Sequence, residues 1–326
     1  MSRNIAFELP FPGRVSPDIK RAQEQSVSWA RRHLLIVDEA GEERVRDWDI
    51  AGLMARWVPD AVGADLDLAV DTVLVATVLN DEFDSPLGWR SREVDRFCDE
   101  LAAVIAPEEP AEPRTPFRRA LAEVWGRLTQ GASDDWLARH RHHWGWNLEA
   151  SVVETDTLAR HVGPAPEEYF ELRRKAGVIH AMMDLSEKAC GFETAVQVRQ
   201  QPAVRRMLEI TVDVIDTLDD VHSLEKDESR GDCHNLVLVL EHAQGWSRSR
   251  ALAEITGMVC AWCAEFEDRA ALLADLGNRA AGETSRLVDC MRDAMSGYLA
   301  WSRTVGRPPG DCAAGRAGVP HHRGST

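Results

Sequence analysis

Three oxygen-bearing side chains recur every four residues in the second half of the chain, at Asp219, Ser223 and Asp227. On an α-helix this spacing stacks the three side chains on one face, about one turn apart. Upstream, the same face is apolar and carries Leu208, Thr211 or Val212, and Ile215. The oxygen atoms therefore continue a buried stripe, in which a carboxylate persists only beside a cation or a hydrogen-bond donor. Carboxylate and hydroxyl oxygens suit a hard ion such as Mg²⁺, which is often shared with substrate phosphates.

The same segment is open to a plainer interpretation. A charged helix end that forms ion pairs at the surface would look similar, because many charged residues lie close by. They are Asp220, Glu225, Lys226, Glu228 and Arg230. A second acidic cluster elsewhere in the chain would favour the metal site.

Such a cluster follows a nearly continuous apolar run. Residues 68–79 read LAVDTVLVATVL, and residues 80–84, NDEFD, come directly after them. This run is too short to span a membrane, so a helix that is apolar on nearly every side is expected in the protein core. Pro86 and Gly88 mark its end. Because a helix C-terminus carries partial negative charge, carboxylates there are unfavourable unless a cation is bound.

The two acidic clusters together predict one shared site. If the two buried helices face each other, the clusters would hold several divalent ions between them. The natural ligand for that arrangement is a diphosphate.

Composition and periodicity predict a single all-α domain. Pro and Gly cluster at 10–17, 106–115, 163–166 and 305–326, and the stretches between them follow helical periods. One clear apolar helix face lies within residues 284–302 and carries Leu287, Met291, Ala294 or Met295, Tyr298 and Trp301. We expect the domain to cover residues 1–305 and residues 306–326 to form a disordered tail.

Charge and targeting signals limit the class of partner. The chain of 326 residues has a formal net charge of −16, which argues against nucleic acid as a partner. The N-terminal residues MSRNIAFELPFPGR lack the apolar segment of a signal peptide, and we expect no membrane span. An acidic protein that binds a diphosphate must neutralise it with metal ions and a few placed cations.

The cysteines and histidines favour structural roles. The seven cysteines are an odd number scattered along the chain, which indicates a reduced, cytoplasmic protein. Cys260 and Cys263 form a CxxC in an apolar helix without partner ligands, and we expect structural thiols. His140, His142 and His143 have no acidic residue at ligand spacing, so we expect them to pack in the core or lie on the surface.

Several motifs, taken in order along the chain, resemble one protein family, the bacterial class I terpene synthases (terpene cyclases). NDEFDSPLGW, from residue 80, is similar to the aspartate-rich DDxxD motif with its GPLG-like continuation, and DDVHSLEKD, from residue 219, resembles the second metal motif, NDxxSxxxE. Further similar segments are ELPFPGRVSPD, HHWGWNLEASVVE, EEYFELRRKAG, GDCHNLV and WSRTVGRPP. The resemblance runs from about residue 8 to residue 308.

The resemblance implies a set of roles. Metal ligands would be Asn80, Asp81 and Asp84 on one side and Asp219, Ser223 and Asp227 on the other, holding three Mg²⁺ ions, with Mn²⁺ as a substitute. Arg173 would sense the diphosphate, and Gly177 would act as effector at the break of the following helix. Lys226 and Arg307 would contact phosphate oxygens. Trp301 would be an active-site aromatic residue, with Phe83 and Trp57 as weaker candidates for stabilising a carbocation.

The chain departs from the family motifs at four positions. Asn80 stands where the family has the first Asp, Asp219 where it has Asn, Asp227 where it has Glu, and Pro308 where it has Tyr. One charge is lost at Asn80 and one is gained at Asp219, so the summed charge of the ligands is unchanged. We interpret this as a redistributed metal site and keep a degenerate, weakly active homologue as the alternative.

The resemblance predicts a Mg²⁺-dependent terpene cyclase that ionises a linear isoprenyl diphosphate and cyclises the carbocation. Ala76 and Thr77 are small at positions where many relatives carry aromatic residues, so we lean towards geranylgeranyl diphosphate (C20), with farnesyl diphosphate (C15) close behind. The alternatives are a non-catalytic prenyl-diphosphate-binding homologue and a prenyl diphosphate synthase. The synthase is disfavoured because a second complete DDxxD motif is missing. The sequence leaves open whether the chain forms a homodimer.

Overall fold

A computed structural model describes residues 7–83, 98–99, 101–105, 115–160, 163–275 and 281–305. Every regular element in these ranges is a helix, which confirms the all-α prediction. The helices are α1 (Ile19–Arg32), α2 (Glu39–Trp48), α3 (Ile50–Trp57), α4 (Gly63–Phe83), α6 (Pro116–Thr129), α7 (Asp134–Arg160), α8 (Pro166–Ala176), α9 (Ile179–Ala189), α10 (Val196–Arg199), α11 (Pro202–Arg230), α12 (Leu236–Gln244), α13 (Arg248–Asp275) and α14 (Ala281–Ser302). The expected tail, 306–326, lies outside the described residues.

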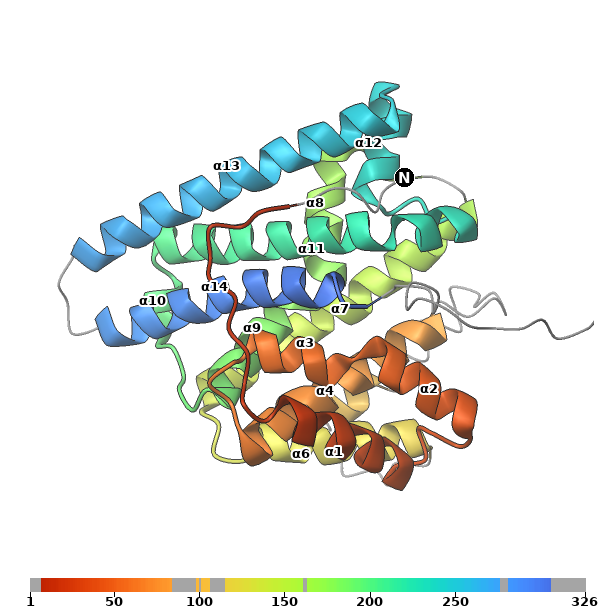
Figure 1. Cartoon of the computed structure of the whole chain (residues 1–326), viewed down its shortest axis with the longest axis vertical. Helices are drawn as coiled ribbons and strands as arrows, with labels where there is room; N and C mark the ends of the chain where they lie inside the picture. Colours follow the sequence, from red (N-terminus) through yellow and green to blue (C-terminus); the bar gives the residue numbers. More distant parts are fainter. Residues whose placement is uncertain are drawn as a thin grey trace, which may run out of the picture.

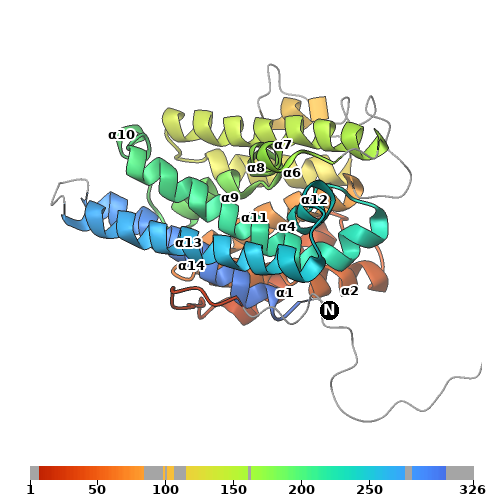
Figure 2. The same cartoon turned by 90° about the horizontal axis from the view of Figure 1, so that it is seen from above.

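The long helices pack side by side into a bundle (Figure 1). Helices α11, α13 and α14 contact one another, and α3 packs against α14. Helix α4 contacts α1, α3, α6 and α9, and α7 lies against α8 and α9. Seen from above, α11 crosses the middle of the molecule between α7 and the pair α13 and α14 (Figure 2). Both helices that carry the predicted acidic clusters are therefore central elements.

Helix α11 forms as its sequence predicts. Pro202 occupies its first turn, where the missing N–H costs nothing, and Gly231 ends it with a φ of 72°. The apolar stripe Leu208, Val212 and Ile215 is buried. On α14 the predicted face from Leu287 to Tyr298 is likewise buried. These two faces anchor the polar end of α11 to the core.

Helix α4 is a core helix, as the apolar run indicates. Residues 68–75 are all buried, whereas residues 76–78 are partly exposed. One buried member is charged: Asp71 accepts a hydrogen bond of 2.7 Å from Arg127 Nη2 through its Oδ2. Its Oδ1 has no partner among the described residues. Burial, with repulsion from Asp67 and Glu123, raises the pKa of Asp71 to about 7 against the pull of Arg127.

The described helices give no sign of a bilayer-spanning segment, because none combines the length and the apolar character that crossing would need. The six cysteines in the described ranges are free thiols. Cys263 of the CxxC is buried and Cys260 is exposed.

Asp71 gives a prediction for stability against pH. The unfolded chain loses this proton near pH 3.8, whereas the folded chain keeps it to about pH 7. The stabilising effect of the protonated group is therefore complete at low pH and lost as pH rises through about 7. We expect this residue to lower the free energy of unfolding by up to about 4 kcal/mol across that window.

The measurement is urea unfolding of the wild type and of Asp71→Asn from pH 4 to pH 8. The amide still accepts from Arg127 but cannot ionise, so we expect a flatter pH dependence. Asp47→Asn, a change at an exposed position of α2, is the matched control and should follow the wild type. Equal slopes for Asp71→Asn and the wild type would show that Asp71 is ionised throughout.

Candidate active site

The predicted ligands on α11 cluster around Asp227. Ser223 Oγ donates a hydrogen bond to Asp227 Oδ2. The same oxygen accepts from Asn235 Nδ2 at 2.9 Å. Asn235 is buried and caps the start of α12, where its Oδ1 accepts from the backbone N–H of Val237 at 3.1 Å. The cap fixes the direction in which the Asn235 amide group points, and through it the position of Asp227.

Arg173 of α8 lies across the carboxylates of α11. Its Nη2 donates to Asp219 Oδ2 at 2.7 Å, and its Nε donates to Asp220 Oδ1 at 3.1 Å. Its Nη1 lies 3.9 Å from Asp216 Oδ1. The Arg173 side chain is 16% exposed.

Two tyrosines complete the hydrogen bonds of these carboxylates. Tyr298 Oη of α14 donates to Asp219 Oδ1 at 2.6 Å. Tyr169 Oη of α8 donates to Asp220 Oδ2, which also accepts from the backbone N–H of Leu236 at 2.5 Å. Four elements, α8, α11, α12 and α14, therefore meet at one short stretch of α11.

The carboxylates outnumber the cations that the described residues bring to them. Burial raises the pKa of Asp216 well above its usual range, and it raises the pKa of Asp220 to about 7, although Arg173 opposes both shifts. Burial also raises the pKa of Asp227. The buried Oδ2 of Asp216 has no hydrogen-bond partner among the described residues. The site therefore favours the binding of a further cation.

The donor set fits a hard divalent cation. Asp219, Ser223 and Asp227 offer only oxygen atoms, and two of them are already within hydrogen-bond distance of each other. Oxygen ligands of this kind are the ones that Mg²⁺ and Mn²⁺ prefer. Arg173 lies at the edge of the same set, where a planar guanidinium suits forked contacts with phosphate oxygens.

The segment between α8 and α9 is closely packed against α11, and its backbone is strained. A Cβ added to Gly177 would lie 2.2 Å from Asp216 Oδ1, so only glycine fits there. The next residue, Val178, has a φ of 54°. A β-branched residue in this region is a true outlier, and such strain costs about 1–3 kcal/mol. The break predicted at Gly177 is therefore a strained link directly beside the acidic cluster.

A small apolar cavity lies below this link. Its lining consists of Thr72, Val73, Ala76, His140, Trp144, Val178, Ala181, Met182 and Leu185. Its volume is about 10 Å³, which is room for about one water molecule. Ala76 lines it as the size argument requires, whereas Thr77 is not part of the lining and donates to the carbonyl oxygen of Val73 at 2.9 Å.

The structure places the other predicted aromatic and basic residues as follows. Trp57 is fully buried and donates through Nε1 to Ser186 Oγ at 2.9 Å, so it is a core residue. Trp301 donates to the carbonyl oxygen of Asp49 at 3.1 Å and packs against Tyr298 with 5.5 Å between ring centroids. Lys226 lies exposed near the end of α11.

The remaining predictions fall outside the description. The backbones of Asn80, Asp81 and Phe83 form the last turn of α4, but their side chains are not described. Asp84 and Arg307 lie outside the described residues. The ligand roles of these residues, and the expectation that the two acidic clusters face each other, stay predictions.

Sequence reasoning assigned no site role to five residues of the cluster, Asp216, Asp220, Tyr169, Tyr298 and Asn235. Asp216 and Asp220 lie at i and i+4, one residue beside the predicted ligands, and this spacing could have shown a second acidic stripe on α11. Tyr298 was placed on the correct helix face but given no role. Asn235 carried one usable signal, the preference of Asn for the residue before a helix.

Comparisons with known proteins show which proteins this chain is similar to. A family model described as "Terpene synthase family 2, C-terminal metal binding" matches residues 71–265. Pentalenene synthase of Streptomyces exfoliatus is 32% identical over 337 aligned positions, covering 100% of this chain and 99% of the relative. The 7-epi-alpha-eudesmol synthase of Streptomyces viridochromogenes, named as cyclizing (2E,6E)-farnesyl diphosphate, is 31% identical and covers 94% of this chain and 92% of its own length.

Solved structures show the same arrangement of helices. The crystal structure of an a-eudesmol synthase superposes with a TM-score of 0.84 at 27% identity, over 93% of this chain and 100% of the other. Germacradien-4-ol synthase from Streptomyces citricolor gives a TM-score of 0.83 at 27% identity, over 94% of this chain and 100% of the other.

Gly177 supplies a test of the site. In Gly177→Ala the new methyl group would collide with Asp216 and push apart the carboxylates that hold Arg173. We expect turnover of the enzyme's substrate to fall at least about tenfold while helix content by circular dichroism is kept. Gly257→Ala on α13, where an added Cβ meets nothing within 4 Å, is the control and should keep full activity. Undiminished turnover by Gly177→Ala would mean that the close contact with Asp216 has no part in the reaction.

Proposed function

Because this chain belongs to the bacterial class I terpene synthase family, we propose that it converts farnesyl diphosphate into a cyclic sesquiterpene in a Mg²⁺-dependent reaction. The observation that carries the proposal is Arg173, held against Asp219 and Asp220 beside the Ser223–Asp227 pair. A guanidinium suited to phosphate oxygens and a set of oxygen atoms suited to a divalent ion therefore lie at the same end of α11.

The residues of the chain divide the reaction between them. Asp219, Ser223 and Asp227 would hold divalent ions from one side, and Asn80, Asp81 and Asp84 from the other. When bound, these ions stabilise the negative charge that develops on the departing diphosphate. Arg173, Lys226 and Arg307 would add contacts to the phosphate oxygens. We propose three Mg²⁺ ions, which Mn²⁺ can replace.

The apolar lining of the cavity below Gly177 suits the hydrocarbon end of the substrate, for which the cavity of about 10 Å³ would have to widen. Its lining is mostly apolar, and it lies between α4, whose last turn carries Asn80 and Asp81, and the link that follows α8. Val178 belongs to this lining and is separated from Arg173 by a single helical turn. A group bound at Arg173 and a chain in the cavity can therefore belong to one molecule.

The residues around the cavity limit the space that Ala76 leaves for the substrate chain. Ala76 is small on the α4 side, but Trp144 and Leu185 line the same cavity from other helices. The aromatic bulk missing at position 76 is thus supplied by another helix. Two of the similar proteins are named as cyclizing (2E,6E)-farnesyl diphosphate. We therefore propose farnesyl diphosphate as substrate, in place of the C20 preference that position 76 suggested by itself.

The proposal is tested by incubating the purified protein and Mg²⁺ separately with C10, C15, C20 and C25 diphosphates. Released diphosphate is measured and the products are identified by gas chromatography with mass spectrometry. We expect cyclic C15 products as the main outcome and no turnover in excess EDTA. Full activity in EDTA would exclude the metal mechanism, and binding without turnover would indicate a non-catalytic homologue.

Matched variants on α11 separate ligand loss from general damage. Ser223→Ala should raise the Mg²⁺ concentration for half-maximal rate and lower kcat/KM at least about tenfold. Ser229→Ala removes an exposed hydroxyl of the same helix, which donates to the carbonyl oxygen of Lys226 at 2.7 Å. We expect wild-type kinetics from this control.

A further inference from the structure

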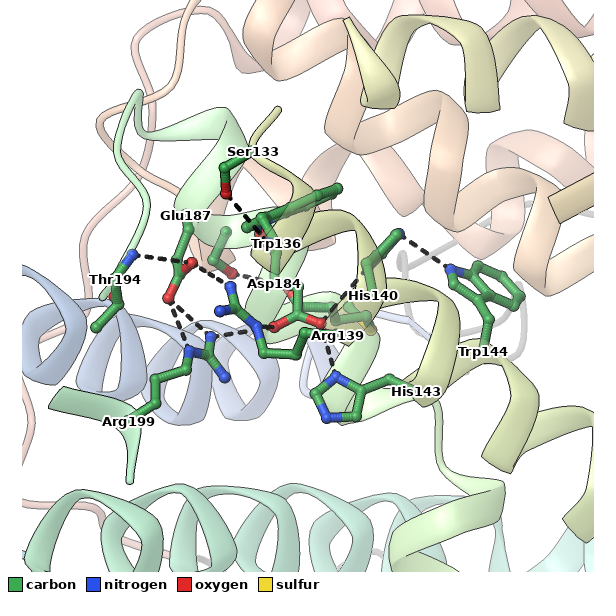
Figure 3. A network of polar contacts seen from close by, with 12 residues as sticks. Ser133, Trp136, Arg139, His140, His143, Trp144, Asp184, Glu187, Thr194 and Arg199 are labelled. Carbon is green, nitrogen blue, oxygen red and sulfur yellow. Dashed lines mark hydrogen bonds and ion pairs between the residues drawn. The ribbon is translucent and has the colours of Figure 1, made fainter. Parts of the chain in front are cut away.

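A second buried polar network lies on α7, α9 and α10, away from the acidic end of α11 (Figure 3). At its centre Asp184 and Glu187 are completely buried. Arg139 Nε donates to Asp184 Oδ1 at 2.8 Å, and Arg199 Nη2 donates to Glu187 Oε1 at 2.8 Å. His143 Nδ1 lies 2.6 Å from Asp184 Oδ2. The charges of two carboxylates and two guanidinium groups balance each other. The network therefore forms a rigid support, without net charge, for the His140 ring that packs on it.

His140 stands above this network and has no exposed surface. Its ring is stacked between two indoles, with centroid distances of 5.5 Å to Trp125 and 4.6 Å to Trp136. The packing role expected for this histidine is therefore confirmed. An acidic partner was not expected, but Asp184 comes to it from α9, with Oδ2 3.6 Å from His140 Nδ1. Spacing along α7 could not show a contact across 44 residues of sequence.

One hydrogen bond determines the tautomer of His140. Trp144 Nε1 lies 3.1 Å from His140 Nε2, one turn further along α7. An indole N–H can only donate, so His140 Nε2 must be the acceptor and its proton must sit on Nδ1. Asp184 Oδ2 lies 3.6 Å from this Nδ1, just beyond hydrogen-bond distance. Figure 3 shows the nitrogen of the Trp144 indole facing the His140 ring.

His140 and Trp144 both line the small apolar cavity that Ala76 and Val178 also line. Among the residues of that lining, His140 is the one nitrogen base. Burial lowers the pKa of His140, which keeps the ring neutral. A neutral imidazole with a free lone pair beside a carbocation would remove a proton from it. The Trp144 N–H occupies that lone pair.

We propose that Trp144 is a specificity-determining residue, whose N–H prevents His140 from deprotonating carbocation intermediates before cyclisation is complete. The inference rests on the proposed cyclase function. Without the indole donor, His140 Nε2 would take a proton from a carbon next to the cationic carbon. The C–H electron pair would become the C=C bond, the cation would be discharged, and the imidazolium would face Asp184. The proton would pass to solvent after product release.

Trp144→Phe tests this because it keeps an aromatic ring and removes the N–H. We expect olefins formed from early cations, acyclic or monocyclic, to increase at least about tenfold relative to the wild-type main product. The matched control is the double variant His140→Phe/Trp144→Phe, which makes the same change at position 144 but has no base. We expect its product ratios to return towards the wild type. Asp184 stays paired in it through Arg139 and His143.

Unchanged product ratios in an active Trp144→Phe, or the same shift in the double variant, would overturn the inference. A second measurement needs no variant and no substrate: ¹⁵N NMR of the imidazole nitrogens in the wild-type protein. We expect a protonated Nδ1 and an unprotonated Nε2 on His140, and a proton on Nε2 would overturn the inference as well. Failure of the wild type to release diphosphate from any isoprenoid would instead contradict the proposed function. The two failures can be told apart, because the NMR experiment measures the protonation of His140 without any turnover.

Discussion

The site depends on one guanidinium group among three carboxylates. Arg173 bonds Asp219 and Asp220 and lies 3.9 Å from Asp216. Without a cation, three acidic groups on two turns of a buried helix could not all be ionised. Removing one partner of such a buried pair costs about 3–5 kcal/mol. Arg173 therefore stabilises the polar end of α11 within the core and fixes α8 against it.

This interaction would also change when a metal ion binds. Asp219 is bonded by Arg173 and Tyr298 and is at the same time a proposed metal ligand. A divalent ion at Asp219 would compete with the guanidinium, and a released guanidinium can turn to phosphate oxygens. Residues 174–177 connect Arg173 to Val178, which lines the cavity. Gly177 fits against Asp216, and the backbone of Val178 is strained. A displacement at Arg173 would therefore be transmitted to the cavity wall.

The sequence predicted the helices of the site better than its contacts. The apolar run before Asn80 and the stripe before Asp219 identified two core helices, because burial follows the period of a single helix. The partners of Asp220 and Asp184 were missed, since Tyr169, Leu236 and the histidines reach them from other helices. Periodicity describes one helix at a time, whereas these bonds arise only when helices pack. Position 76 by itself could not show the bulk around it for the same reason, because Trp144 lines the same cavity from α7.

The central claim, that Arg173 exchanges its carboxylates for metal-bound diphosphate, is tested most directly by thermal unfolding with Mg²⁺ alone and with Mg²⁺ plus inorganic diphosphate. The matched control is Arg174→Ala, which breaks a comparable pair with Asp213 on the same two helices. We expect diphosphate to raise the Tm of the wild type and of Arg174→Ala by similar amounts. In Arg173→Ala we expect a larger rise from Mg²⁺ alone, because the carboxylates are free, and little further rise from diphosphate. Equal shifts in all three proteins would contradict the exchange.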